Sequence, residues 1–377
     1  MPLLRWLYPK KQRILFYCHF PDQLLAKRND IGILGLLKKT YRAPFDWFEG
    51  WSMDASDQIV VNSNFTRSTS KSVFPNLKRD LDVIYPCVSA DAGEEKELDK
   101  LWDGRYKVLL SINRFERKKD IRLALAAYTR VSGEERRNTR LIIAGGYDQR
   151  VSENVSYHKE LEHLAAKSGL KYATARTVPT ALAVPDDIQV LFLLSVPDAF
   201  KTTLLQSAVL LLYTPSNEHF GIVPVEAMQH GLPVLASNTG GPLETIVDGK
   251  TGWLRDVSKE EEWAYIMRKA LHAFSPERKQ AMSEAARSRV QEHFIRPIMA
   301  KRFDQQITKM ISGRRPSFVE RETVILAIGV VGCLVAGVLA AVMRRVFAAD
   351  PQSTAFIRAE RARTRNKANP ASIFGEA

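Results

Sequence analysis

The sequence predicts an α/β protein whose larger part is a parallel β-sheet covered by helices on both faces. From Lys107 onward, short apolar runs alternate with helical patterns, which is typical of such a sheet. The expected strands lie at 107–112, 140–145, 188–195, 208–213, 233–236 and 251–254. Helical patterns separate most of these strands, and three further helical stretches are expected at 258–273, 277–292 and 297–312. The alternation therefore predicts one domain that ends near residue 312.

A smaller α/β unit is expected before this domain. Its strands are predicted at 12–20, 58–63 and 82–88, and a helix is predicted at 45–56. Three strands are few for a doubly wound domain, which usually has about five or six. We therefore expect an incomplete N-terminal domain at 1–95 and a C-terminal domain at 96–312.

Composition and charge restrict the class of partner. The chain has 377 residues, of which 45% are hydrophobic, and this is enough for two packed domains. Its net charge of +13 is spread along the sequence apart from an excess in the C-terminal tail. We interpret the charge as favouring phosphate groups and a membrane surface, and we expect no nucleic acid. Cys18, Cys87 and Cys333 have no metal-ligand spacing and predict neither a disulfide framework nor a zinc site.

The C-terminal region carries a membrane signal. A basic linker at 313–322 leads to an uncharged apolar run at 323–343, about as long as the roughly 20 residues that cross a bilayer. Arginines flank this run, and a basic tail follows at 344–377. We expect a transmembrane or re-entrant segment. A single span would place the main domain in the lumen and a re-entrant segment would keep both sides cytosolic, while a buried core helix is the remaining alternative.

Charged residues and glycines follow several strands of the expected C-terminal sheet. Arg114 and Lys119 follow the first strand, Gly145 the second and Glu218 the fourth. Ligands of parallel sheets bind at the carboxyl ends of the strands, so we expect these residues to lie close together. Two cations beside free backbone N–H groups suit a diphosphate. A solvated basic loop is the alternative.

The most specific stretch runs from Asn217 to Gly231. It places Glu218 and Glu226 on either side of a Phe-Gly turn, with Glu226 in an apolar helical context where a carboxylate is costly unless it has a partner. Carboxylates accept hydrogen bonds from pairs of hydroxyls, so Glu218 suits a sugar and Glu226 suits a ribose. Free backbone N–H groups are expected where this helix begins, at Phe220, Gly221, Ile222 and Val223.

These motifs resemble the donor half of glycosyltransferase family 4, which contains retaining enzymes of the GT-B fold. The resemblance rests on the two glutamates, on Arg114 with Lys119, and on GGPLETIVDGKTGWL at 240–254. Four segments resemble more narrowly the dolichol-pathway mannosyltransferases that form α-1,3 and α-1,6 linkages in asparagine-linked glycosylation: FYCHFPDQLL, SDQIVVNSNFT, SINRFERKKD and LYTPSNEHFGIVPVEAM. The implied GT-B fold has two Rossmann-like domains, an acceptor domain at 1–95 and a nucleotide-sugar donor domain at 96–312.

The resemblance also implies substrates and a location. The donor would be GDP-mannose and the acceptor a dolichyl-diphosphate oligosaccharide, on the cytosolic face of the endoplasmic reticulum membrane. A complex with other glycosylation enzymes is compatible with this assignment. No metal or cofactor is expected, and the D-x-D motif at Asp80–Asp82 precedes a strand in the half that would not hold a donor metal.

Residue roles are carried over from the family motifs. Arg114 and Lys119 would bind the diphosphate and stabilise the departing GDP, and Glu218 would contact the transferred mannose. Further donor contacts are implied for Glu226 at the ribose, for the backbone at Phe220, Gly221, Ile222 and Val223, and for Gly145. His19 aligns with a histidine on the acceptor side, and an ordinary histidine at a strand end is its alternative.

Family members begin with a strand and a glycine-rich loop before the FYCHFPD segment, so we expect an acceptor domain truncated at its N-terminus. Two main hypotheses follow. The first is a retaining mannosyltransferase, and the second is a non-catalytic form that binds nucleotide sugar or partners at the membrane. A soluble transferase similar to glycogen synthase is a third alternative, against which the apolar run at 323–343 argues.

Overall fold

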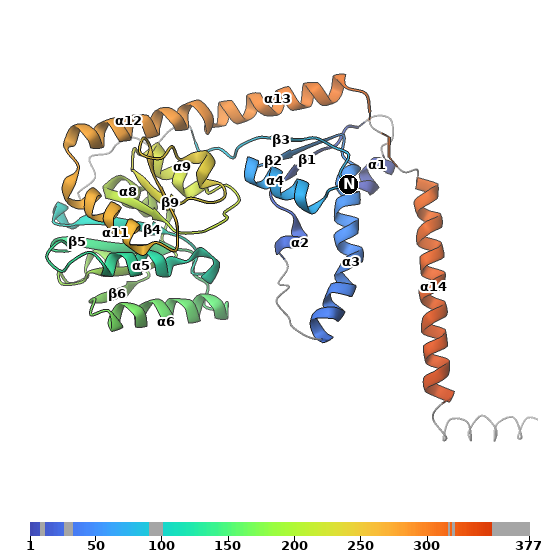
Figure 1. The fold of residues 1–377 in the computed structure, drawn as a ribbon, viewed down its shortest axis with the longest axis horizontal. Coiled ribbons are helices and arrows are strands. Elements are labelled where there is room, and N and C mark those ends of the chain that lie inside the picture. Colours follow the sequence, from blue (N-terminus) through green and yellow to red (C-terminus); the bar gives the residue numbers. More distant parts are fainter. Residues whose placement is uncertain (8–11, 26–32, 90–100, 316, 319–320, 349–377) are drawn as a thin grey trace, which may run out of the picture. The chain divides into compact units, whose positions relative to one another are not determined.

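The computed structural model describes residues 1–7, 12–25, 33–89, 101–315, 317–318 and 321–348. The chain divides into two compact units. The larger unit contains Met1–Arg5 and Lys10–Arg315, and the smaller contains Trp6–Pro9 and Pro316–Ala377. Figure 1 shows the elements of each unit.

A three-stranded parallel sheet forms the N-terminal part of the larger unit. Its order is β1 (Leu15–Cys18), β2 (Gln58–Val61) and β3 (Leu81–Val83). The helices of this region are α1 (Pro2–Leu7), α2 (Asp22–Leu25), α3 (Ile33–Asp54) and α4 (Asn64–Val73). The three predicted strands are confirmed, and the helix predicted at 45–56 is the second half of the longer α3, which continues through Pro44.

A seven-stranded parallel sheet dominates the larger unit, in the order β10-β9-β8-β4-β5-β7-β6. Its strands are β4 (Lys107–Ile112), β5 (Thr139–Gly145), β6 (Tyr172–Ala175), β7 (Val190–Leu194), β8 (Ala208–Tyr213), β9 (Val234–Ser237) and β10 (Gly252–Arg255). Six of these strands were predicted. The strand β6 was not predicted. It is a short, partly exposed edge strand with polar residues, and it therefore lacks the apolar run that marks a central strand.

Helices cover both faces of the larger sheet because successive side chains of each strand point to opposite faces. Val108 and Leu110 of β4 join one core, whereas Leu109 joins the other. The first core includes residues of α8 (Asp198–Ser207), α9 (Ile222–Gln229) and α12 (Pro276–His293). The second includes residues of α5 (Ile121–Thr129), α6 (Ser152–Lys167) and α11 (Glu260–Arg268). The remaining α-helices of this region are α7 (Val178–Leu182), α10 (Pro242–Thr245) and α13 (Arg296–Ser312). Two 3-10 helices, Leu101–Gly104 and Arg117–Lys119, and a π-helix, Lys269–Ala273, complete its described part.

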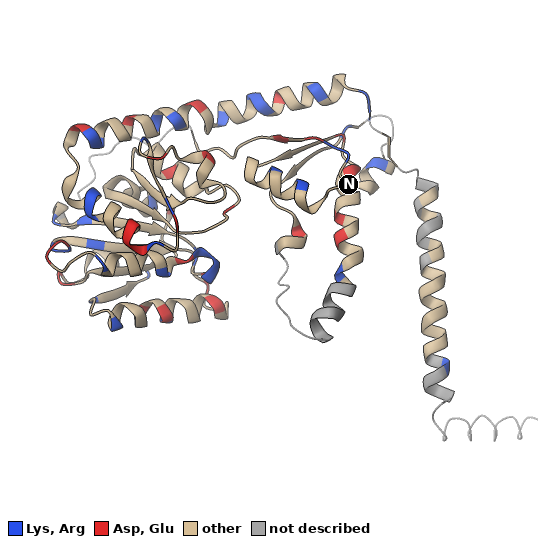
Figure 2. Ribbon diagram, in the orientation of Figure 1, with Lys and Arg blue, Asp and Glu red and all other residues tan. Residues whose placement is uncertain are grey.

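Charged residues are distributed over the helices and loops of the larger unit (Figure 2). Both signs of charge occur along the ribbon of α12 and α13, and basic residues predominate on α13. This distribution agrees with the even spread of basic residues in the sequence.

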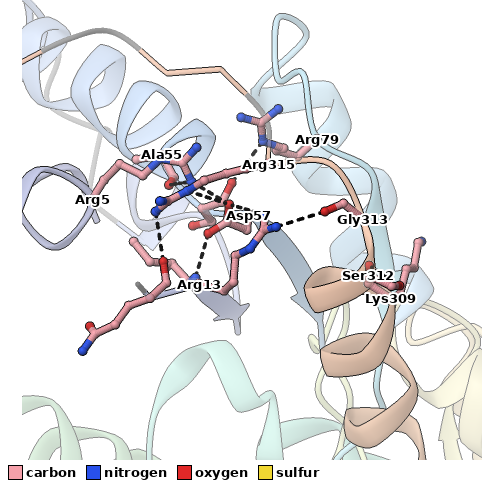
Figure 3. Close-up of polar contacts among 12 residues, drawn as sticks. Arg5, Arg13, Ala55, Asp57, Arg79, Lys309, Ser312, Gly313 and Arg315 are labelled. Carbon is pink, nitrogen blue, oxygen red and sulfur yellow. Dashed lines mark hydrogen bonds and ion pairs between the residues drawn. The ribbon is translucent and has the colours of Figure 1, made fainter. Parts of the chain in front are cut away.

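A buried carboxylate joins the residues after α13 to the small sheet (Figure 3). The side chain of Asp57 is 1% exposed, and an oxygen of its carboxylate lies 2.7 Å from Nη1 of Arg5, 3.4 Å from Nη1 of Arg13 and 3.5 Å from Nε of Arg315. All three arginines also donate to backbone carbonyls: Arg5 to that of Ala55 at 3.4 Å, Arg13 to that of Gly313 at 3.0 Å, and Arg315 to that of Gln12 at 2.9 Å. We call Arg5, Arg13, Asp57 and Arg315 the Asp57 cluster.

The C-terminal apolar run is helical, within α14 (Arg321–Ala348). Among the residues that the structure describes, no helix is long and apolar enough to cross a membrane. The transmembrane or re-entrant segment expected at 323–343 is therefore not supported. Most of the basic tail expected at 344–377 lies outside the described residues.

Candidate functional site

The loops that follow β4, β5, β8 and β9 are tied together at the carboxyl edge of the large sheet. Asn113 N–H donates to the carbonyl of Ala144 at 3.0 Å, which joins the ends of β4 and β5. The hydroxyl of Thr214 donates to the carbonyl of Lys119 at 2.7 Å, which joins the loops after β8 and β4. Gly241 N–H donates to the carbonyl of Glu218 at 2.7 Å. The expected convergence of these loops is confirmed.

Two glycines make this convergence possible. Gly145 has φ +154°, and a Cβ there would lie 1.9 Å from the carbonyl oxygen of Asn113. A Cβ at Gly241 would lie 2.2 Å from the carbonyl oxygen of Phe220. Since real side chains never approach backbone so closely, both positions require glycine. Gly145 is buried at this contact between loops, so its observed role is to let the two loops meet.

Lys119 and Glu218 form an ion pair at the centre of the edge. The Nζ atom of Lys119 donates to Oε2 of Glu218, and the two side chains are 13% and 20% exposed. Burial acts to raise the pKa of Glu218, but the charge and hydrogen bond of Lys119 outweigh it, so the pKa lies below its ordinary value. Glu218 is therefore a carboxylate near neutral pH, fixed by Lys119.

A tyrosine supports this pair. Burial, the charge of Glu218 and a hydrogen bond with Glu218 raise the pKa of Tyr213 well above its ordinary value. The Tyr213 ring lies against Gly221, where a Cβ would be 3.2 Å from the ring. The phenol thus stays protonated and helps to orient the carboxylate.

Arg114 lies at the same edge but does not join this ion pair. Its Nη1 atom lies 3.0 Å from Oε1 of Glu116, and its side chain is 63% exposed. The sequence predicted that Arg114 and Lys119 act on one anion, whereas in the structure they have different carboxylate partners. Arg114 is therefore a solvent-facing cation beside the site.

His219 forms an aromatic stack that the sequence did not predict. Its ring lies 3.6 Å from the ring of Phe20 with an interplanar angle of 10°. The hydroxyl of Ser63 donates to its backbone carbonyl. Burial lowers the pKa of His219, opposed by Glu218 and assisted by the nearby charges of Lys119, Lys118 and His19. The adjacency of His219 to Glu218 in the sequence was the one available signal.

His19 is exposed at the end of β1, and its ring centroid lies 4.8 Å from that of Tyr17. The next residue, Phe20, stacks on the ring of His219, so the end of β1 faces the Glu218 loop. The structure therefore brings His19 to the neighbourhood of the predicted donor residues.

The helix α9 places Glu226 beside a lysine from α8. Nζ of Lys201 donates to Oε1 of Glu226 at 3.0 Å, while Oε2 is buried and has no hydrogen-bond partner among the described residues. Lys201 was missed because it lies on another helix. Glu226 therefore presents one acceptor that still needs a donor.

The beginning of α9 was predicted correctly. Gly221 is the N-cap with φ 84°, and no side chain caps the helix, so its first backbone N–H groups keep free hydrogen-bonding capacity. Ile222 and Val223 open the helix, and Ile222 is 37% exposed. The side chain of Phe220 is buried against Tyr85, so only the backbone of Phe220 can serve a ligand.

Known proteins are similar to this chain in sequence. Residues 93–175 and 181–289 match the model of the family described as Glycosyl transferases group 1. The chain is 47% identical over 353 residues to Alpha-1,3/1,6-mannosyltransferase alg-2 of Neurospora crassa. The aligned residues cover 91% of this chain and 73% of that protein. The chain belongs to the α-1,3/1,6-mannosyltransferase family. A second family member, Alpha-1,3/1,6-mannosyltransferase ALG2 of Kluyveromyces lactis, is 44% identical over 333 residues, with 82% of this chain and 64% of that protein covered.

Solved structures support the same fold. The sucrose-phosphate synthase of Thermosynechococcus elongatus is similar with a TM-score of 0.59 and 19% identity, over 82% of this chain and 76% of that one. This likeness shows the fold alone.

Family membership confirms the predicted glycosyltransferase and does not favour the non-catalytic alternative. The chain spans less than two thirds of the Kluyveromyces family member.

Proposed function

We propose that this chain transfers mannose from GDP-mannose, with retention of configuration, to a dolichyl-diphosphate oligosaccharide, forming α-1,3 and α-1,6 linkages. The observation that carries the proposal is the Lys119–Glu218 ion pair at the carboxyl edge of the large sheet, next to the uncapped start of α9. A fixed carboxylate beside free N–H groups can hold a sugar and a phosphate at the same time.

The donor is assigned to groups from three loops. Lys119 has three N–H donors, so it can hold Glu218 with one and a diphosphate oxygen with another. Arg114, the exposed cation at the same edge, supplies a second positive charge to the diphosphate. Glu218 accepts hydrogen bonds from the mannose hydroxyls, and the unpartnered Oε2 of Glu226 accepts from the ribose.

The chemistry requires stabilisation of a leaving group. As the bond between the anomeric carbon and the diphosphate breaks, negative charge grows on GDP, and Lys119 with Arg114 stabilises it. The acceptor hydroxyl attacks from the face that GDP leaves, and its proton passes to a departing phosphate oxygen. This route retains configuration without an enzymic nucleophile.

The acceptor is assigned to the small sheet. His19 at the end of β1 and the stacked pair of Phe20 and His219 border the Glu218 loop from that side. The range 1–95 would thus act as the acceptor domain and 96–312 as the donor domain. A dolichyl acceptor places the reaction at the endoplasmic reticulum membrane, on the cytosolic face where we propose that GDP-mannose is used, and a complex with other glycosylation enzymes fits there.

The test uses the full chain in detergent with GDP-mannose and a prenyl-diphosphate chitobiose that carries mannose. Mass spectrometry should detect addition of mannose. Lys119→Ala and Glu218→Gln should each lower kcat by about 10² to 10³-fold, as expected when a group that stabilises transition-state charge is lost.

A matched control is Lys171→Ala, which removes a lysine paired with Asp187 at 2.7 Å outside the candidate site. This variant should transfer mannose at the wild-type rate. Binding of GDP-mannose without transfer by the wild-type chain would instead identify the non-catalytic form.

A further inference from the structure

A second charged cavity lies apart from the residues proposed to bind the donor. It has a volume of about 480 Å³ and is lined by residues of α4, β3, α10, α12 and α13. The residues on which its chemistry depends are Arg67, Asp82, Glu244, Arg289, His293 and Arg302. None of the residues assigned above by name to the donor or the acceptor lines it, although Arg67 and Asp82 belong to the range 1–95 proposed as the acceptor domain.

The basic residues of this cavity lie on helices, at spacings that place them on the faces that line it. Arg289 and His293 are four residues apart on α12 and therefore share a face. Arg302 and Gln306 have the same spacing on α13, and Gln306 also lines the cavity. Arg67 comes from the first turn of α4. Three helices thus bring three guanidinium groups and one imidazole to one space.

The two carboxylates of the cavity have partners other than its three arginine side chains. Glu244 accepts from Asn64 N–H, Phe65 N–H and the Asn64 amide at 2.8 Å each, and from the Tyr85 hydroxyl at 2.9 Å. Asp82 accepts from the Gln58 amide at 2.8 Å and from Nζ of Lys309 at 2.9 Å. Asp82 is paired with Lys309, whereas the partners of Glu244 are all neutral. One uncompensated carboxylate therefore faces three guanidinium groups, and the cavity keeps an excess of positive charge.

Two of the arginines have unused donors. Within the described part of the chain, no hydrogen bond or ion pair involves the side chain of Arg67 or Arg302, and Arg302 only lies over the Tyr85 ring at 5.8 Å. Arg289 donates to the backbone carbonyls of Thr245 at 2.7 Å and Glu244 at 2.6 Å. Oε1 of Gln306 is buried without a partner among the described residues.

We propose that this cavity binds a phosphate-bearing ligand through Arg67 and Arg302, at a site separate from the donor diphosphate. Planar guanidinium groups with free N–H donors match phosphate oxygens, and an anion offsets the repulsion between neighbouring cations. The volume suits a diphosphate with part of an attached group. Burial and the charges of Arg289 and Arg302 lower the pKa of His293, which leaves a neutral imidazole able to accept or donate a hydrogen bond.

The probe is inorganic pyrophosphate, titrated calorimetrically into the full chain. Because pyrophosphate also suits the donor site, the titration is made in the Lys119→Ala background. Binding should persist there, and Arg67→Gln and Arg302→Gln should each weaken it by at least about tenfold, since each removes a charge-assisted contact. Both side chains lack polar partners in the described structure, so the variants should remain folded by circular dichroism.

Lys301→Gln is the matched control, because this exposed lysine is next to Arg302 on α13 but does not line the cavity. It should bind pyrophosphate like its parent. Equal weakening by Lys301→Gln, unchanged affinity in both arginine variants, or loss of all binding in Lys119→Ala would overturn the proposal. The measurement reads binding only, so a chain that transfers no mannose can still pass it.

A second titration identifies the source of the phosphate. A short prenyl diphosphate in micelles is compared with inorganic pyrophosphate, in the Lys119→Ala background and in its Arg302→Gln derivative. Tighter binding of the prenyl compound that depends on Arg302 assigns the site to a lipid-linked diphosphate. Equal binding of both probes assigns it to a free phosphate compound. If the affinity of neither probe changes in the Arg302→Gln derivative, the proposed site is contradicted.

Discussion

At the residue scale, Lys119 sets the charge state of Glu218. The pair is mostly buried, so each charge would be costly alone, and each stabilises the other. The pKa of Glu218 is lowered because Lys119 outweighs the effect of burial. A carboxyl with a lowered folded-state pKa contributes stability above its unfolded pKa and loses it as the pH falls through the folded value.

Lys119→Met should therefore destabilise the protein by about 1–3 kcal/mol at neutral pH, because it leaves Glu218 buried without its cation. The difference from wild type should shrink as the pH falls through the lowered pKa of Glu218, where the carboxylate is protonated. Urea unfolding at a series of acidic to neutral pH values measures this. A difference that is constant with pH would show that the two groups are not electrostatically coupled.

Gly145 offers a second test at this scale. Gly145→Ala places a Cβ against the carbonyl oxygen of Asn113 at a φ that L-residues avoid, so the loops after β4 and β5 must separate. We expect a loss of about 2–3 kcal/mol in the free energy of unfolding. Gly133→Ala is the control, since a Cβ there has nothing within 4 Å. Equal unfolding midpoints in the two variants would refute the close contact.

At the element scale, the first turn of α4 is capped from another part of the chain. Ser63 is the N-cap and accepts from Thr66 N–H, while Glu244 of α10 accepts from the first two backbone N–H groups of the helix. A negative charge is favourable at a helix N-terminus. The position of α4 thus depends on a carboxylate far away in sequence.

Glu244→Ala should destabilise the protein by about 1–3 kcal/mol, because it leaves two backbone N–H groups and the Tyr85 hydroxyl without their acceptor. Amide hydrogen exchange at Asn64 and Phe65 should become faster than elsewhere in the helix. The control is Glu262→Ala, which removes an exposed carboxylate paired with Lys259. Unchanged exchange at those two amides would contradict the capping role.

The sequence pattern was sufficient to predict the strands that are buried on both faces, such as β4, β5 and β8, because each is a continuous apolar run. It was insufficient for β6, whose edge position allows polar residues. The meeting of the loops that carry Lys119 and Glu218 could be predicted, because both follow neighbouring parallel strands. The roles of Lys119, Glu218 and Glu226 in binding the donor stay predictions. The partners Lys201 and Phe20 could not be predicted, since their contacts depend on tertiary placement and leave no local pattern.

At the scale of the larger unit, the Asp57 cluster connects segments that are distant in sequence. Three guanidinium groups share one carboxylate that is 1% exposed, and each of them also donates to a backbone carbonyl. The cluster therefore joins the entry of β1 to the residues that follow α13.

Asp57→Asn should destabilise the small sheet by about 2–4 kcal/mol, because it leaves three arginines without their anion and replaces an acceptor of Ile14 N–H. Limited proteolysis should then cut near Gly313 more rapidly. Asp187→Asn is the control, as its exposed pair with Lys171 should contribute little. Equal cleavage of both variants would exclude a special role for the cluster.

The Asp57 cluster also has a consequence for biosynthesis. Arg5, Arg13 and Asp57 leave the ribosome early, whereas Arg315 emerges only after the whole large sheet has been made. The large sheet can form from its own contiguous strands while the chain is still growing. The small sheet is translated first, but its contact between Asp57 and Arg315 can form only after α12 and α13 have been synthesised. The large sheet can therefore be complete before the small sheet, although it is synthesised later.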